Sequence, residues 1–171
     1  MKLRILNIIL INLFIIFLSS CKIGGYSFTG ADIAANIKTV TIEYFPNRAS
    51  LVQPDLSNVL TETLRNKFVS QTNLELINSY GDLIFEGEIT NYTVAPQAFQ
   101  GNETAAVNRL TVSVRVKFTN TVEPAKSFDS SFSRYADFDS AESLMSVESE
   151  LIQQISNELV EDIFNKSVAN W

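Results

Sequence analysis

The amino-acid sequence predicts an α+β fold in which two helices pack on one face of a four-stranded mixed sheet. Apolar and polar side chains alternate in four stretches and recur at helical spacing in two others, in the order β-α-β-β-β-α. A strand that reaches the next strand through a helix favours parallel pairing, and three strands joined by turns favour an antiparallel meander. With both helices on the same face, the result is a two-layer sandwich.

The first strand is expected within residues 37–45, with Val40, Ile42 and Tyr44 sharing its buried face. The first helix is expected to begin at Pro54-Asp55 and to end at Thr72-Asn73, because proline is tolerated in a first turn and an acidic side chain there complements the helix dipole. Its apolar stripe consists of Leu56, Val59, Leu60, Leu64 and Phe68. Such a stripe predicts a helix that lies on a sheet.

Three further strands are expected between residues 83 and 138, with residues 96–104 as a polar excursion and residues 74–77 as a candidate for a short extended piece. Their apolar positions are Leu83, Phe85 and Ile89, then Leu110, Val112, Val114, Val116 and Phe118, then Phe128, Phe132 and Phe138. Gly87 falls on the apolar face, where its missing side chain allows close approach of a helix or a bulge. The opposite face is polar and displays Glu86, Glu88, Arg115 and Lys117.

The last helix is expected to follow Ser143, which is a plausible N-cap residue. Its buried stripe consists of Leu144, Val147, Leu151, Ile155, Leu159 and Ile163. Three aromatic residues lie outside the clear strands, namely Tyr92, Phe99 and Trp171. These are either contact residues or parts of a packed lid.

The N-terminus has the layout of a lipoprotein export signal. Lys2 and Arg4 precede an apolar run from Ile5 to Leu18, and two serines lead to Cys21, the one cysteine of the chain. The run of roughly 14 residues is too short to span a bilayer. We therefore expect a signal peptide over residues 1–20, acylation of Cys21, a lipidated tether over residues 21–36 and a single α+β domain over residues 37–171.

Composition excludes several classes of chemistry. Removing Lys2 and Arg4 from the 13 basic residues leaves 11 against 19 acidic ones, so the mature chain carries a net charge of −8 and nucleic acid is a disfavoured partner. There is no histidine, and the acylated Cys21 offers no thiol, which removes histidine-ligated zinc and cysteine catalysis. Glu86 and Glu88 could form an acid pair, but two solvated carboxylates opposite Arg115 and Lys117 are the simpler interpretation. The sequence therefore predicts no enzyme, no metal site and no cofactor.

Several short motifs, in this order, are typical of one family. They are Cys21 followed by Gly25-Tyr26-Ser27-Phe28-Thr29-Gly30, Pro54-Asp55-Leu56-Ser57 leading to Thr61-Glu62 and Leu64-Arg65, Gly81-Asp82-Leu83 with Phe85, Gly87 and Ile89, Asn108-Arg109-Leu110-Thr111, Phe132-Ser133-Arg134-Tyr135, Asp162-Ile163-Phe164-Asn165 and Ala169-Asn170-Trp171. The chain resembles the LptE family, the lipopolysaccharide-assembly lipoproteins of the outer membrane. The resemblance extends over nearly the whole mature sequence.

This resemblance implies a plug inside the lumen of an LptD-like β-barrel, where it supports barrel assembly and helps to deliver lipopolysaccharide to the outer leaflet. It also implies basic residues that contact lipopolysaccharide. Arg109, Arg115 and Lys117 are our candidates, because they lie on one strand and could pair with lipid phosphates. Lys22 is not the aspartate that commonly retains lipoproteins in the inner membrane, so we expect the periplasm-facing side of the outer membrane.

A second class of function is compatible with the same residues. A tethered α+β module could equally regulate another envelope machine, such as a cell-wall synthase. The identity of the partner separates the two hypotheses.

Overall fold

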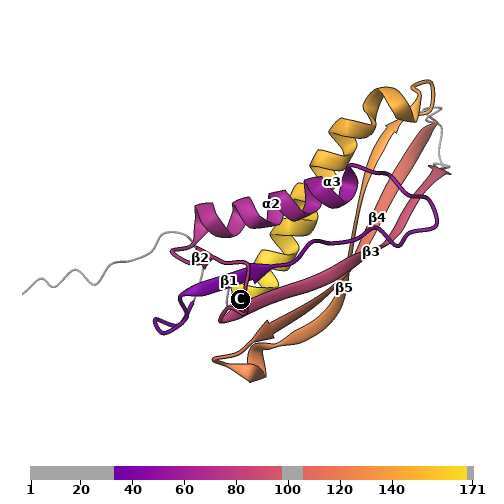
Figure 1. The fold of residues 1–171 in the computed structure, drawn as a ribbon. Helices are drawn as coiled ribbons and strands as arrows, with labels where there is room; N and C mark the ends of the chain where they lie inside the picture. The colour runs from indigo at the N-terminus through magenta and orange to yellow at the C-terminus, as the bar shows by residue number, and fades with distance from the viewer. Residues whose placement is uncertain (1–32, 98–105, 169–171) are drawn as a thin grey trace, which may run out of the picture.

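A five-stranded mixed sheet carries two helices on one of its faces in the computed structural model, which describes residues 33–97 and 106–168 (Figure 1). The elements in chain order are β1 (Thr39–Ile42), α2 (Leu56–Gln71), β2 (Glu75–Leu76), β3 (Leu83–Gln97), β4 (Val107–Asn120), a 3-10 turn η1 (Pro124–Lys126), β5 (Phe128–Asp139) and α3 (Leu144–Val168). The strands lie side by side in the order β2-β1-β3-β4-β5. The predicted α+β class and the predicted pair of helices are therefore confirmed.

The expected number of four strands is wrong, because β2 adds a fifth. This strand has two residues, and Glu75 and Leu76 pair in parallel with Thr39 and Val40 of β1. It lies within residues 74–77, the candidate for a short extended piece, and its pairing with β1 makes it part of the sheet. The other expected pairings are present: β1 is parallel to β3, and β3, β4 and β5 form an antiparallel meander.

The expected buried face of the first strand is also partly wrong. Val40 and Ile42 are buried, but β1 ends at Ile42, Tyr44 is exposed and Phe45 enters the core instead. The chain nevertheless continues along the edge of β3. The Glu43 N–H donates to the Phe85 carbonyl at 2.9 Å, and the Arg48 N–H donates to the Ile89 carbonyl at 2.8 Å.

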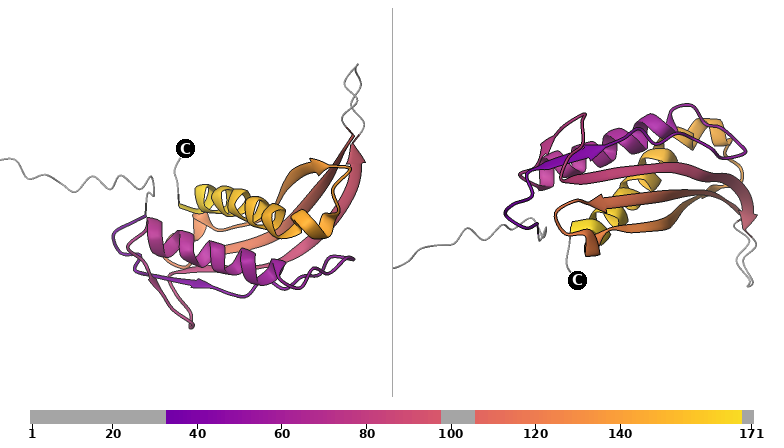
Figure 2. Two further views of the ribbon diagram at one scale, coloured as in Figure 1. Left: turned by 90° about the horizontal axis from the view of Figure 1, so that it is seen from above. Right: turned by 60° about the horizontal axis from the view of Figure 1, so that its bottom comes forward.

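The core lies between the helices and the inner face of the sheet, which both views of Figure 2 show as two layers. The α2 stripe is buried as expected at Leu56, Leu60, Leu64 and Phe68, whereas Val59 is only half-buried. An aromatic chain joins the two layers. The Phe68 ring lies 4.9 Å from Phe85 and 5.1 Å from Phe164 of α3, and Phe85 lies 4.7 Å from Phe118.

The ends of the helices lie close to the predicted positions. The Gln53 side chain accepts the Leu56 N–H at 2.8 Å at the start of α2, and Thr72 closes the helix with its N–H on the Phe68 carbonyl at 3.0 Å. Ser143 directly precedes α3, and its hydroxyl donates to the Ser146 hydroxyl at 3.1 Å. None of the helices in residues 33–97 and 106–168 combines the length and the apolar character that a membrane span requires.

Tyr92 belongs to β3, so its expected place outside the strands is wrong. The strand continues to Gln97, and the Tyr92 side chain is 2% exposed on the inner face. Its hydroxyl donates a hydrogen bond to the Glu148 carboxylate of α3, and burial raises the pKa of Tyr92 well above its usual value. The contact joins the far half of β3 to the first turns of α3. Phe99, Trp171 and Cys21 lie outside the described residues.

Gly87 allows a close approach, as predicted, but the group that approaches is neither a helix nor a bulge. The Phe45 ring packs directly on the Gly87 backbone from the segment that follows β1. A Cβ atom at position 87 would overlap both this ring and the Arg115 carbonyl oxygen of the neighbouring strand. This contact holds the segment that follows β1 against the middle of β3.

We expect the substitution Gly87→Ala to lower the free energy of unfolding by about 2 kcal/mol, because the Arg115 carbonyl belongs to a central strand and cannot move away. The midpoint of urea unfolding of the soluble domain measures this loss. The exposed Ser131→Ala on β5 is the matched control and should change stability by less than about 0.5 kcal/mol. Equal midpoints for Gly87→Ala and wild type would refute the role given to Gly87.

Asp82 ties the start of β1 to the start of β3. Its Oδ2 accepts the N–H groups of Lys38 at 2.8 Å and Thr39 at 3.0 Å, and also the Thr39 hydroxyl at 3.0 Å. These hydrogen bonds, led by the one from the Lys38 N–H, lower the pKa of Asp82 from its ordinary value of 3.8. A carboxyl whose pKa is lower in the folded state stabilises the fold above the unfolded-state pKa and loses that contribution as the pH falls.

The substitution Asp82→Asn should therefore destabilise the domain at pH 7 and have a progressively smaller effect as the pH falls below about 4. Chemical denaturation of both proteins between pH 7 and pH 2.5 gives the difference in stability at each pH. A difference that stays constant over this range would show that the Asp82 carboxylate does not contribute through its charge. The exposed Asp139→Asn serves as a control for the loss of one negative charge.

Candidate interaction surface on the outer face of the sheet

The outer face of the sheet is not covered by either helix. Figures 1 and 2 show α2 and α3 on the same side of the strands. Because side chains alternate along a strand, the residues of β3, β4 and β5 that do not point to the helices point outward. The predicted polar face is confirmed: Glu86, Glu88, Arg115 and Lys117 all belong to this side and line one shallow hollow.

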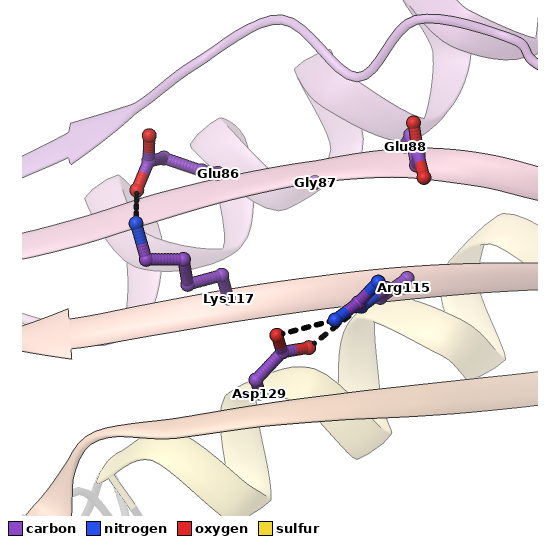
Figure 3. A pocket seen from close by; sticks show the side chains of 6 residues that line it. All are labelled: Glu86, Gly87, Glu88, Arg115, Lys117 and Asp129. Atoms are coloured by element: carbon purple, nitrogen blue, oxygen red, sulfur yellow. Dashed lines mark hydrogen bonds and ion pairs between the residues drawn. The ribbon is translucent and has the colours of Figure 1, made fainter.

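This hollow of about 340 Å³ lies over the first half of β3 and is lined by Glu86, Gly87, Glu88, Arg115, Lys117 and Asp129 (Figure 3). The strand register places Lys117 opposite Glu86 and Arg115 opposite Glu88. Gly87 faces the core, so only its backbone contributes to the floor. The hollow is therefore a charged depression and not an apolar pocket.

The two cations of the hollow are already paired with carboxylates. The Arg115 guanidinium makes two hydrogen bonds to the Asp129 carboxylate of β5, at 2.9 and 2.8 Å. The Lys117 ammonium lies 2.8 Å from the nearer oxygen of Glu86 on β3. Glu88 makes no ion pair with any residue in the part of the chain that the structure describes.

Arg109 makes a similar arrangement farther along the same strand. Its guanidinium binds Asp137 of β5 at 2.7 and 2.8 Å and stacks over the Tyr135 ring with 3.6 Å between the guanidinium carbon and the ring centroid. Between the two charged ends the face carries hydroxyl groups, and the Ser113 and Ser133 hydroxyls lie 2.9 Å apart. The surface between the two charged ends is therefore polar.

Hydrogen bonding favours the charged form of three of these groups. The hydrogen bonds from Arg115 and Arg109 lower the pKa of Asp129 and Asp137, and the bond to the Glu86 carboxylate raises the pKa of Lys117. Asp129, Asp137 and Lys117 therefore stay ionised near neutral pH. Exposed ion pairs contribute little to stability, so an incoming group could replace either partner.

The three candidate contact residues share a face, but they do not form one cluster. Arg115 and Lys117 are neighbours, whereas Arg109 lies six residues away, which corresponds to roughly 20 Å along a strand. Asp129 and Asp137 were not among the residues predicted for this face, because the pairing of β4 with β5 decides which acids meet which cations. The alternation around Phe128 and Phe132 was the signal that could have found them.

The arrangement is suited to binding. Within residues 33–97 and 106–168, no group of three or more carboxylate, histidine or cysteine side chains could hold a metal ion. Glu86 is held by Lys117, so the two glutamates of β3 are in unlike environments. What the face offers to another molecule is a set of exchangeable ion pairs and hydroxyl groups.

The fold and this surface define a class of protein, the two-layer α+β module with one sheet face uncovered and polar. Within this class, the chain belongs to the LptE family of lipopolysaccharide-assembly proteins, whose family model matches residues 37–167. The resemblance described above is thereby confirmed. No curated protein matches this sequence.

Solved structures with a similar fold include protein CT253 from Chlamydia trachomatis, with 13% sequence identity and a TM-score of 0.53, which covers 78% of this chain and 99% of that one. A minor lipoprotein from Acinetobacter baumannii is similar with 15% identity and a TM-score of 0.45. The match covers 76% of this chain and 91% of the lipoprotein. At this level of identity the likeness to CT253 concerns the fold alone.

Proposed function

We propose that this protein is an outer-membrane lipoprotein that acts as the structural plug and assembly subunit of an LptD-type β-barrel and so supports delivery of lipopolysaccharide to the cell surface. The observation that carries the proposal is membership of the lipopolysaccharide-assembly family over residues 37–167. The protein acts by binding, and no chemical step is assigned to it.

The outer face of the sheet supports this proposal. The lumen of a transmembrane β-barrel is polar, whereas a protein that faces lipid offers an apolar surface. On this face, three cations stand against the five carboxylates of Glu86, Glu88, Asp129, Asp137 and Asp139. A charged face with intervening hydroxyls fits a polar wall better than it fits a hydrocarbon layer.

The anchor in this proposal is Cys21. Stable membrane attachment takes at least two acyl chains, which a diacylated cysteine provides. Residues 22–32 separate the anchor from the described domain, and such a stretch spans at most roughly 40 Å. The domain would therefore stay close to the periplasm-facing surface of the outer membrane, where the barrel opens.

Affinity purification of the full-length protein from detergent-solubilised outer membranes tests this function. We expect a large β-barrel polypeptide to co-purify, and we expect the substitution Cys21→Ser to remove the acyl chains seen by mass spectrometry of the N-terminal peptide. Recovery of a penicillin-binding protein or an inner-membrane complex in place of a barrel would favour the alternative, a module that regulates a cell-wall synthase.

Arg109, Arg115 and Lys117 remain our proposed contacts for lipopolysaccharide. Each would exchange its carboxylate partner for a lipid phosphate, to which guanidinium and ammonium groups donate well. The net charge of the mature chain opposes this exchange, so the local pairs decide whether it occurs. Arg115 and Lys117 are the stronger candidates, because they are adjacent and could share one phosphate group.

Replacing both Arg115 and Lys117 with Gln should weaken lipopolysaccharide binding by the purified domain about fivefold or more, as measured by titration at low salt. The matched variant Glu86→Gln with Asp129→Asn releases the same two cations from their partners and should strengthen binding by a similar factor. If both variants bind as the wild type does, these residues do not contact the lipid.

A further inference from the structure

A second hollow, of about 630 Å³, lies on the helical side of the molecule, where the first turns of α2 and α3 lie beside each other (Figure 2). We call it the helix-start cleft. Its lining residues come from both helices and from the segment before α2: Gln53, Asp55, Val59, Met145, Ser146, Glu148, Ser149, Glu150, Ile152 and Gln153. None of them belongs to the outer face of the sheet.

The charges of this cleft are of one sign. It is lined by the carboxylates of Asp55, Glu148 and Glu150 and by no lysine or arginine. None of the three makes an ion pair with a residue in 33–97 or 106–168. Glu148 is fixed by the hydrogen bond from Tyr92, so its position is set by the core. The cleft thus differs from the outer face, where each cation already has a partner.

The cleft also presents apolar surface. Met145 is 89% exposed at its edge, and Val59 and Ile152 line it from the two helices. Two further exposed aliphatic side chains, Leu51 at 56% and Val52 at 61%, directly precede Gln53 of the lining. Exposed apolar groups beside a polar hollow are typical of protein interaction sites, and methionine adapts readily to a partner surface.

We propose that the helix-start cleft binds a polypeptide segment of the partner in which a lysine or arginine is flanked by aliphatic side chains. The basic group would pair with a carboxylate that lines the cleft, and the aliphatic groups would cover Met145 and Val52. The inference rests on the proposed function, since the segment is taken to belong to the barrel. It assigns the contact to a surface other than the sheet face.

The same charges disfavour other occupants. Three carboxylates repel the phosphates of lipopolysaccharide, so the cleft is not a lipid site. A second copy of this chain would approach with its own net charge of −8, which the carboxylates of the cleft repel. A basic segment of a different polypeptide is the complementary partner.

Site-specific photo-crosslinking in cells tests the location. A photoreactive amino acid at position 145 of the full-length protein should crosslink to the barrel, and peptide mapping should place the crosslink within a few residues of a lysine or arginine of the barrel. The control position is Tyr80, which is 91% exposed in the turn before β3 and should give little crosslink to that segment. A crosslink from position 145 only to lipid, only to a second copy or to nothing would overturn the proposal.

Charge neutralisation tests the chemistry. The double variant Asp55→Asn with Glu150→Gln keeps the shape of both side chains, and asparagine preserves the N-cap preference at the start of α2. We expect this variant to retain about fivefold less barrel than the wild type in co-purification at moderate salt. The matched variant Glu43→Gln with Glu75→Gln removes two exposed carboxylates near β1 and β2 and should retain the barrel fully.

These outcomes separate the inference from the function on which it rests. Suppose that the wild-type protein co-purifies with a barrel, but position 145 gives no crosslink to it and the Asp55→Asn, Glu150→Gln variant retains it fully. The cleft is then not the site, and the proposed function stands. If no barrel co-purifies with the wild type, both proposals fail.

Discussion

The strict alternation of side chains along β4 sets which side of the sheet is buried and which side is polar. Leu110, Val112, Val114, Val116 and Phe118 are all buried toward the helices. Their neighbours in sequence must therefore point to the other side, because successive side chains of a strand point to opposite faces. The burial of one face and the polarity of the other are two consequences of a single pattern. A shift of one residue in the pairing of β4 would place Arg115 in the core, so the register is strongly determined.

The packing of the Phe45 ring on the Gly87 backbone positions the N-terminal part of the domain on the same sheet. β1 has only four residues, and its parallel contact with β3 is short. The ring on the bare backbone and the hydrogen bonds from residues 43–48 to β3 hold the chain after β1 in place. The loop that follows is thereby brought to the start of α2, so that Leu51, Val52 and Gln53 stand at the edge of the helix-start cleft.

The two candidate surfaces differ in how their charges are compensated. On the outer face, Arg109, Arg115 and Lys117 each have a carboxylate within hydrogen-bonding distance. The helix-start cleft is lined by three carboxylates and by no lysine or arginine, and exposed apolar groups lie at its edge. In the proposed complex, the polar wall of the barrel lumen would face the outer face of the sheet, and a basic group of the barrel would enter the helix-start cleft.

The sequence by itself determined the α+β class, both helices, the meander and the polarity of the outer face, because each depends on a period that is visible along a single segment. It also contained the order of motifs that identifies the family. Only the folded chain shows that residues 75–76 pair with β1, that Phe45 replaces Tyr44 in the core, that Tyr92 reaches Glu148, and that Asp129 and Asp137 bind the arginines. Each of these depends on a contact between residues that no local pattern relates. The helix-start cleft is of the same kind, since its carboxylates come from helices that lie about ninety positions apart in the chain and meet only when both pack on the sheet.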